Sequence, residues 1–472
     1  MLRHFRPTVK VFDTCEAGFR FSLSFYPGDR MRLLSCCLAV FLTTTLAAQT
    51  PAPRTTPLRG SLERRLTILL DQPPFDRATW GVLVQDDRGR VLFQRNADRL
   101  FVPASNTKLV VAAAAAVLLP EDFRVTTSLY VNGAVRDGIL LGDLVLYGRG
   151  DPTFSTRCYA VDTLAPGACD SSAVLMGALA DSVRARGIRR ITGQVVGDGS
   201  YFEPRLLHAN WGLFDANWWY AAPVSGLAFN DNSIDFRITP AESLDAPPTI
   251  TWSPDLGLIA FENRARTGPA DSASTIGNHF FRRPGTWEIW AEGTVALGRR
   301  PRTESFAVPD PNLFAARALA GALAARGIAV EGGSAGTTDS LAYRAARIDS
   351  TAFALDDGSG LSAGNLVTPR AFVRLLDYVR RHPRRELLVG GMPRSGQRGS
   401  LARRFLATPL EERVVAKTGS IFRVNTLSGY VERAGDRWVT VSIQANSHNV
   451  RGRDVLAQID SIVVEIGKGS LR

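Results

Sequence analysis

The sequence predicts a discontinuous α+β domain that carries an inserted β-rich module. Three observations support this: an apolar helical run early in the chain, a middle region of short strands and turns, and antiparallel strands near the C-terminus that return to the same core. The chain has 472 residues, 45% apolar and 21% charged, which excludes wholesale disorder, collagen and a coiled-coil rod. The sequence shows no internal repeat period, which argues against a solenoid or a propeller.

The N-terminal segment is expected to direct export rather than to fold. We interpret residues 1–30 as an upstream mis-start and residues 31–48 as a signal peptide, because a basic start precedes an apolar stretch that ends in small residues. That stretch is too short and too rich in Thr for a stable transmembrane anchor. The Pro/Thr-rich residues 49–60 read as a linker. We therefore expect an exported protein of the periplasm or cell envelope.

The first part of the discontinuous domain is expected over residues 61–122. It contains a helix at 61–70, a hairpin at 80–93 and a run of eleven apolar residues after Lys108 that predicts a buried helix. The inserted module is expected over 123–302, with strands at 144–147, 191–197 and 234–238 and a helix at 172–186. We interpret the Trp cluster at 211–219 as core or interdomain packing rather than a platform for sugars.

The second part of the domain is expected over residues 303–472. Helices are predicted at 312–326, 368–381 and 459–466, and strands at 414–417, 426–431 and 438–445. In the insert, Asn230 and Asn232 are expected to serve turns. After removal of the signal peptide, Cys158 and Cys169 are the two remaining cysteines, and in an exported chain their spacing predicts one disulfide.

Charge and histidine spacing exclude two classes of partner. The net charge is +11, but the basic excess is spread along the chain and no Lys/Arg run is interleaved with aromatic residues. We therefore expect no nucleic-acid partner. The five histidines are scattered without the spacing of metal ligands, so we expect no metal site and no cofactor.

Lysine is scarce in this chain. The lysines are Lys10, Lys108, Lys417 and Lys468, and the other 52 of the 56 basic residues are arginine. A buried Lys can lose its proton and act as a base, whereas Arg stays charged. Lys108 and Lys417 are therefore candidates for roles that Arg cannot take over.

Ser105 and Lys108 form an S-x-x-K motif at the start of the apolar helix. Residues i and i+3 share a helix face, so the amine can reach the hydroxyl. The helix N-terminus favours the negative charge that develops there, and an apolar environment lowers the pKa of the Lys. The pair can therefore act as nucleophile and base, although a plain N-cap role for Ser105 is the alternative.

The string Lys417-Thr418-Gly419-Ser420 follows a predicted strand and precedes another. On an edge strand, Lys and Thr can bind a substrate carboxylate, while the backbone aligns a peptide by strand addition. Gly419 permits close approach. S-x-x-K and K-T-G in this order are typical of β-lactamases and penicillin-binding proteins.

Further strings resemble class C low-molecular-mass penicillin-binding proteins, the D-alanyl-D-alanine carboxypeptidase/endopeptidase family. The resemblance covers most of residues 75–450, and includes PASNTK before the helix, LYGRGDPTF at 146–154, GQVVGDGSYF at 193–202, YAAPVSGLAFNDNS at 220–233, DDGSGLSAGNLVTP at 356–369 and AKTGS at 416–420. It implies a penicillin-binding/β-lactamase-like transpeptidase fold, an antiparallel sheet flanked by helices, with extra domains inserted after the S-x-x-K helix.

The resemblance also implies an activity and roles for residues. The enzyme would be a serine-type D-Ala-D-Ala carboxypeptidase/endopeptidase acting on peptidoglycan stem peptides, and β-lactams would acylate it. Ser105 would attack with Lys108 as base, and Lys417 and Thr418 would bind the terminal carboxylate. The backbone N–H groups of Ser105 and Ser420 would form the oxyanion hole.

One family motif is missing at its usual position. The S-x-N motif, commonly S-D-N, is not found upstream of the DGSGLS string. Asn230-Asp231-Asn232 lacks the Ser, and Ser362-Ala363-Gly364-Asn365 is an S-x-x-N, which makes Ser362 and Asn365 possible substitutes. The alternative function is therefore a catalytically impaired or non-catalytic cell-wall binding homologue. A β-lactamase fits less well, because the insert and its strings match the carboxypeptidases.

Overall fold

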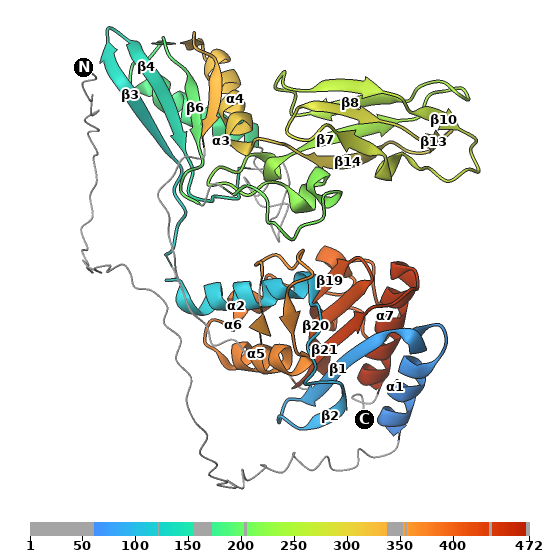
Figure 1. Ribbon diagram of the computed structural model, residues 1–472. Coiled ribbons are helices and arrows are strands. Elements are labelled where there is room, and N and C mark those ends of the chain that lie inside the picture. The colour runs from blue at the N-terminus through green and yellow to red at the C-terminus, as the bar shows by residue number, and fades with distance from the viewer. Residues whose placement is uncertain are drawn as a thin grey trace, which may run out of the picture. The chain divides into compact units, whose positions relative to one another are not determined.

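The structure is a computed structural model of the chain, drawn in Figure 1. It describes residues 61–120, 122–154, 172–202, 205–337, 353–354, 356–433 and 437–468. The expected signal peptide, the linker and the Cys158–Cys169 pair lie outside the described residues, so these expectations stay predictions. Within the described ranges, no helix has both the length and the apolar character needed to cross a membrane.

An antiparallel five-stranded sheet forms the centre of the main domain. Its order is β19 (Val414–Ile421), β20 (Val424–Arg433), β21 (Arg437–Asn446), β1 (Thr79–Asp86) and β2 (Val91–Arg95). The early strand β1 pairs with the late strand β21 in a register that sets Val82 opposite Ile443. This pairing joins the two ends of the described chain and confirms the discontinuous α+β domain.

Helices cover both faces of this sheet (Figure 1). One face buries residues of α1 (Ser61–Asp71) and α7 (Gly452–Lys468), and the other buries residues of α2 (Thr107–Leu118), α5 (Pro369–Arg381) and α6 (Arg385–Val389). Strand residues alternate between the faces: Val414 and Ala416 join the α1/α7 core, and Val415 joins the α2/α5 core. Lys417 therefore lies on the α2 face, in the middle of the same strand.

The S-x-x-K helix α2 is buried along one side only. Thr107, Leu109 and Ala113 are buried, but Val111 is 47% exposed and Leu118 is 76% exposed. The expectation of a buried helix is thus correct for one face and wrong for the other. An apolar run shows that a helix can be buried, but it does not show how many neighbours cover it.

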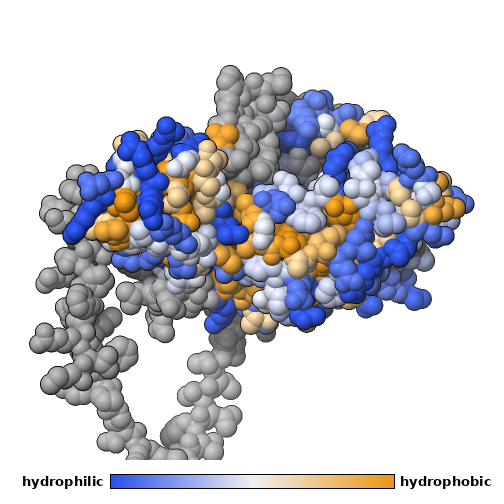
Figure 2. Space-filling model, turned by 90° about the horizontal axis from the view of Figure 1, so that it is seen from above, coloured by the Kyte–Doolittle hydropathy of each residue, from blue (hydrophilic) through white to orange (hydrophobic). Residues whose placement is uncertain are grey.

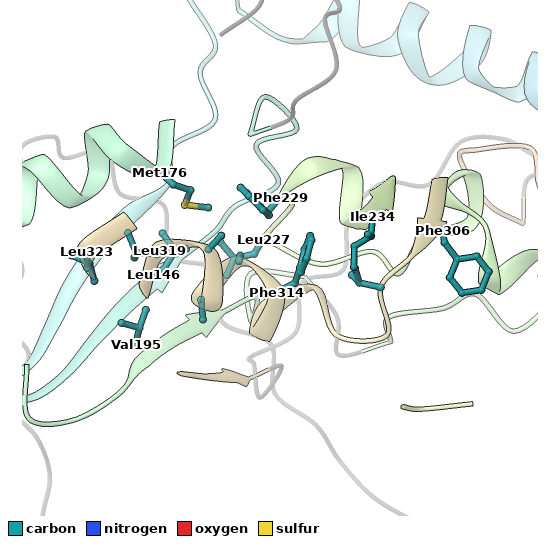
Figure 3. Close-up of a cluster of buried hydrophobic side chains, with 14 of the residues drawn as sticks. Leu146, Met176, Val195, Leu227, Phe229, Ile234, Phe306, Phe314, Leu319 and Leu323 are labelled. Atoms are coloured by element: carbon teal, nitrogen blue, oxygen red, sulfur yellow. The ribbon is translucent and has the colours of Figure 1, made fainter. Parts of the chain in front are cut away.

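The first part of the insert is a six-stranded sheet with two helices. The sheet contains β3 (Ser128–Arg136), β4 (Ile139–Tyr147), β5 (Arg190–Ile191), β6 (Val195–Asp198), β15 (Ala329–Val330) and β16 (Ser334–Thr337). Only β3 runs antiparallel to its neighbour. The helices are α3 (Ser172–Ala185) and α4 (Pro311–Ala324), and Figure 3 shows Leu319 and Leu323 of α4 beside Leu146 and Val195 of the sheet.

These pairings extend the insert beyond the predicted boundary at residue 302. The sequence predicts the second part of the main domain over residues 303–472. Instead, β15 and β16 pair with β5 and β6, and α4 contributes Phe314 to the core of the insert. Helical periodicity indicates a buried face but does not say which core buries it.

The second part of the insert consists of short sheets around an aromatic cluster. The strands are β7 (Ser233–Thr239), β8 (Thr249–Ser253) and β14 (Arg302–Ala307); β9 (Ala260–Asn263), β11 (Phe280–Arg282) and β12 (Glu288–Ala291); and β10 (Arg266–Gly268) with β13 (Thr294–Ala296). Phe236 is fully buried, with its ring centroid 5.3 Å from that of Phe280 and 5.4 Å from that of Phe261. The expectation of a β-rich texture holds for this region.

The Trp cluster divides between interior and surface. Trp218 is 6% exposed and packs edge-on against Phe306, with ring centroids 5.7 Å apart, whereas Trp219 is 49% exposed. Hydrophobic and hydrophilic residues are interspersed on the face shown in Figure 2. The expected core packing is thus found for Trp218, whereas the exposed Trp219 is not part of the core.

Leu427 tests the core of the main domain. It is fully buried in the α1/α7 core, so Leu427→Ala should lower the free energy of unfolding by about 2–5 kcal/mol. Leu406, which is 49% exposed, offers a matched control, and Leu406→Ala should cost about 0.5 kcal/mol or less. Thermal unfolding followed by circular dichroism measures both. Equal unfolding temperatures for the two variants would contradict this assignment of the core.

Candidate active site

Ser105 lies in a tight turn before α2. The turn is the 3₁₀ segment η2 (Ala104–Asn106), and Ala104 has a left-handed φ of 46°. A non-glycine residue in that region costs about 1–3 kcal/mol, so the surroundings must hold it there. The Thr107 hydroxyl does part of this by donating to the Ala104 carbonyl over 3.0 Å. The turn leaves Ser105 partly exposed while its neighbours are buried.

Lys108 lies on the first turn of α2, and its Nζ contacts the hydroxyl of Ser105. The Nζ–Oγ distance is 3.0 Å, and the amine also donates to the carbonyl of Ser359. The residue as a whole is exposed, while its nitrogen lies between these two groups. Desolvation there lowers the pKa of Lys108, and the carboxylate of Asp357 opposes the shift. The predicted Ser–Lys pair is therefore formed in the geometry that proton transfer needs.

Strand β19, which carries K-T-G, is at the edge of the sheet as expected. A neighbouring segment covers its outer edge as far as Ala416, whose N–H donates to the Pro393 carbonyl over 3.1 Å. From Lys417 onward, the described residues provide no backbone partner for this edge. The stretch from Lys417 to Ile421 can therefore accept an added peptide strand.

Lys417 lies in an electrostatic environment that destabilises its charge. Its Nζ donates to the Thr418 carbonyl over 2.6 Å. Burial lowers the pKa of Lys417 to about 8, and the positive charge of Lys108 adds to the shift. Lys108 of the S-x-x-K motif is therefore close enough to the K-T-G motif to affect the protonation of Lys417.

Close packing joins the Ser105 turn to β19. A Cβ added to Gly419 would lie 2.9 Å from the backbone N of Ser105, so only glycine fits there. From β20, the Thr426 hydroxyl donates to the Pro103 carbonyl over 2.9 Å. The approach of turn and strand explains why the glycine of K-T-G is needed.

Asn106 makes a second link between the turn and the sheet. This side chain is fully buried, and its amide nitrogen donates to the Lys417 carbonyl over 2.8 Å. Its amide oxygen accepts from the Ser428 hydroxyl on β20, also over 2.8 Å. The residue that follows the nucleophile thus bonds to the strand that carries K-T-G. This role was not predicted from the sequence, although a polar residue at the start of an apolar helix was a signal for it.

A loop centred on Asp357 closes the other side of the site. Trp211 Nε1, the Gly360 N–H and the Ser362 N–H donate to this carboxylate over 2.8, 2.6 and 2.8 Å. Burial alone would raise the pKa of Asp357, but hydrogen bonds, including those from Trp211 and Asn365, outweigh it and lower the pKa. The loop is thereby fixed in the shape that directs the Ser359 carbonyl to Lys108.

Ser362 and Asn365 hold this loop together. Both are fully buried. The Ser362 hydroxyl donates to the Asp356 carboxylate, and the Asn365 side-chain oxygen accepts from the Asp356 and Asp357 N–H groups over 2.7 and 3.1 Å. Their polar atoms are thus engaged inside the loop, and no described contact joins either to Ser105 or Lys108. The geometry gives them a structural role and does not support either of them as a substitute for the S-x-N motif.

The remaining candidates are distributed differently. The Asn230 amide donates to the Ser233 carbonyl and the Asn232 amide to the Pro223 carbonyl, each over 2.9 Å, as expected for turn residues. One Ser-x-Asn string, Ser447-His448-Asn449, follows β21, after K-T-G instead of before it, and the sequence analysis missed it. Across the described ranges, no three His, Cys, Asp or Glu side chains are grouped as a metal ion requires.

Gly360 tests how the loop supports the nucleophile. Its φ is +80°, and an added Cβ would collide with the Ala104 carbonyl. Gly360→Ala should therefore displace Ser105 and slow acylation by a labelled penicillin, on the order of 100-fold for a shift of about 1 Å. Gly358→Ala is the control, because its Cβ would meet only Val111, at 3.4 Å. Equal acylation rates for two folded variants would show that the approach is not required.

Solved structures share this fold. Penicillin binding protein 4 (dacB) from Haemophilus influenzae has a TM-score of 0.69 at 19% identity, covering 84% of this chain and 98% of that chain. A structure of the same protein complexed with a β-lactam gives a TM-score of 0.64 at 18% identity, covering 86% and 100%. At this identity, the similarity supports the fold.

Sequence relatives extend the comparison. The D-alanyl-D-alanine carboxypeptidase of Actinomadura sp. (strain R39) is 28% identical over 93% of this chain and 91% of the relative. The carboxypeptidase DacB of Mycolicibacterium smegmatis is 28% identical over 88% and 86%. Two stretches, residues 62–342 and 332–466, match a single family. The resemblance inferred from the motifs is confirmed: the chain belongs to the D-Ala-D-Ala carboxypeptidase 3 (S13) family.

Proposed function

We propose that this serine-type D-Ala-D-Ala carboxypeptidase acts on peptidoglycan stem peptides through an acyl-enzyme on Ser105. The observation that carries the proposal is the 3.0 Å contact between Lys108 Nζ and Ser105 Oγ, beside the free edge of β19. Intact nucleophile, base and K-T-G strand favour an enzyme over the non-catalytic homologue. Endopeptidase use of the same site would need the same groups.

The first half-reaction forms the acyl-enzyme. Neutral Lys108 takes the proton of the Ser105 hydroxyl as Oγ attacks the carbonyl of the penultimate D-Ala. The backbone N–H groups of Ser105 and Ser420 stabilise the oxyanion. The C–N bond then breaks, and the terminal D-Ala leaves as an amine that receives the proton from Lys108.

The second half-reaction frees the enzyme. Water attacks the ester on Ser105, and the peptide leaves as a carboxylic acid while the Ser hydroxyl regains its proton.

The ammonium of Lys417 and the hydroxyl of Thr418 bind the terminal carboxylate of the incoming substrate, so that the scissile carbonyl reaches Ser105. A β-lactam carries a comparable carboxylate and carbonyl and acylates the same hydroxyl.

The missing S-x-N segment limits the peptide reaction. The two stretches that match the family meet at residues 332–342, close to where that motif is expected. The absent Ser would share in protonating the leaving amine, and the absent Asn would hold the amide of the substrate. A strained β-lactam ring depends less on both groups than an unstrained peptide does.

The natural setting we propose is the exported compartment that contains peptidoglycan.

The nucleophile and the reaction are tested together. Wild-type protein should bind labelled penicillin covalently at Ser105 and release D-alanine slowly from a D-Ala-D-Ala stem peptide. Ser105→Ala should lose both, whereas Ser182→Ala, on an exposed position of α3, should keep both. Peptide mapping by mass spectrometry locates the adduct, and an assay of free D-alanine follows the peptide. An adduct on another residue would exclude Ser105.

The two lysines should give opposite pH limbs. Deprotonation of Lys108 creates the base, so acylation should accelerate with rising pH and then level off, with a midpoint lower than that of an unperturbed lysine. Loss of the Lys417 charge above pH about 8 should weaken carboxylate binding. Lys108→Arg should be almost inactive, and Lys417→Arg should remove the loss of affinity at high pH, because Arg stays charged. Near-normal acylation by Lys108→Arg would exclude Lys108 as the base.

A further inference from the structure

A chain of side-chain hydrogen bonds ends next to the K-T-G motif. Asn425 Nδ2 lies 2.9 Å from Ser420 Oγ, Asn425 Oδ1 lies 2.9 Å from His448 Nε2, and His448 Nδ1 lies 3.1 Å from the Val450 carbonyl. Asn425 and His448 are both 4% exposed, whereas Ser420 is exposed. The chain therefore links a buried imidazole to a hydroxyl at the open end of β19.

The Ser420 hydroxyl lies beside a group that binds the substrate in the proposed function. It follows Gly419 and lies two residues after Thr418, so the two hydroxyls share a face of β19. Asn425 is its partner across the β19–β20 pair. In the proposed function, Thr418 binds the carboxylate of the substrate, and a neighbouring hydroxyl on the same face can add a hydrogen bond to it.

The Val450 carbonyl determines which nitrogen of His448 carries a proton. A carbonyl only accepts, so Nδ1 must donate to it. In neutral His448, Nε2 is then an acceptor, and the Asn425 amide must present its nitrogen to the ring. The amide oxygen consequently faces Ser420 and takes the hydroxyl proton. In this state Ser420 can only accept hydrogen bonds from a ligand.

Protonation reverses the direction of the chain. When a proton from solvent binds Nε2, both ring nitrogens donate, and Nε2–H requires the oxygen of Asn425. The amide nitrogen then donates to Ser420 Oγ, which is the described arrangement. The Ser420 hydroxyl no longer donates to Asn425, so it can donate its hydrogen bond to a ligand.

We propose that His448 and Asn425 are positioning residues that set whether the Ser420 hydroxyl donates or accepts toward substrate. The three side chains are coupled, because the orientation of the single Asn425 amide sets the hydrogen bond to His448 and the hydrogen bond to Ser420 at the same time. A carboxylate ligand favours the state in which Ser420 donates, so ligand binding and protonation of His448 favour each other.

The surroundings of His448 favour its neutral form. Burial lowers the pKa of His448 below 6.5; the hydrogen bond to the Val450 carbonyl opposes this shift, and the positive Arg423 adds to it. Arg451, just before α7, and Arg453 in its first turn both pair with Asp454, so this carboxylate is not free to pair with His448. The neutral form therefore prevails at pH 7, and the change of state belongs to more acidic conditions.

The first experiment needs no ligand. In the full mature chain, NMR should show the side-chain amide signals of Asn425 shifting with the same midpoint pH as the ring of His448. His448→Gln identifies the ring signal by its loss and should abolish the shift of the amide. His382→Gln is the control, since His382 is bonded at the end of α5 and should leave the Asn425 shift unchanged. An Asn425 amide that ignores the titration of His448 would overturn the proposal.

The second experiment rests on the proposed function. In a Ser105→Ala background, which blocks acylation, benzylpenicillin should bind about threefold to tenfold more tightly below the His448 midpoint than above it, the effect of one hydrogen bond to a carboxylate. The pH dependence should vanish in Ser420→Ala, Asn425→Leu and His448→Gln and persist in His382→Gln. Its persistence in Ser420→Ala or its absence in the parent would overturn the proposal. If penicillin binds at no pH, the proposed function fails, and the NMR titration still decides between the two states of the chain.

Discussion

The close approach of the Ser105 turn to its two glycine neighbours is the constraint on which the site depends. Gly419 approaches the backbone N of Ser105 from β19, and Gly360 approaches the Ala104 carbonyl from the Asp357 loop. A side chain on either glycine would collide with the turn. The strained φ of Ala104 is therefore held from two sides, and this fixes the direction in which the nucleophile points. The sheet, the loop and the helix together hold the turn Ala104–Asn106 in place.

Charge follows from the same packing. Because the turn brings α2 against β19, the amine of Lys108 comes close enough to that of Lys417 to lower the pKa of Lys417 beyond the effect of burial. Desolvation contributes most to both shifts. The two lysines nevertheless need opposite protonation states. Lys108 must be neutral to act as a base, and Lys417 must be charged to bind the substrate carboxylate. The Asp357 carboxylate, which raises the pKa of Lys108, limits how far the base is shifted.

The Ser105–Lys108 pair and the edge strand with Lys417 were predictable from local patterns, because each depends on neighbours in sequence or on period-two alternation. The return of the late strands to the early hairpin was instead inferred from the order of elements along the chain and from the resemblance to the family. The extension of the insert to Thr337 was not predictable in this way, because β15 and β16 are short parallel strands whose partners lie more than a hundred residues away. Asn106 was overlooked for a related reason: its partners Lys417 and Ser428 are brought to it only by the fold.

The groups that contact Lys108 have a consequence for the mechanism. The described groups bonded to Lys108 Nζ are the Ser105 hydroxyl and the Ser359 carbonyl. A carbonyl can orient an ammonium but cannot pass a proton, because it only accepts. Among the described residues, no second hydroxyl contacts Lys108 to relay a proton to the leaving amine. Lys108 must therefore serve as both base and acid in turn, which makes a leaving group that needs little protonation the easier substrate for this site.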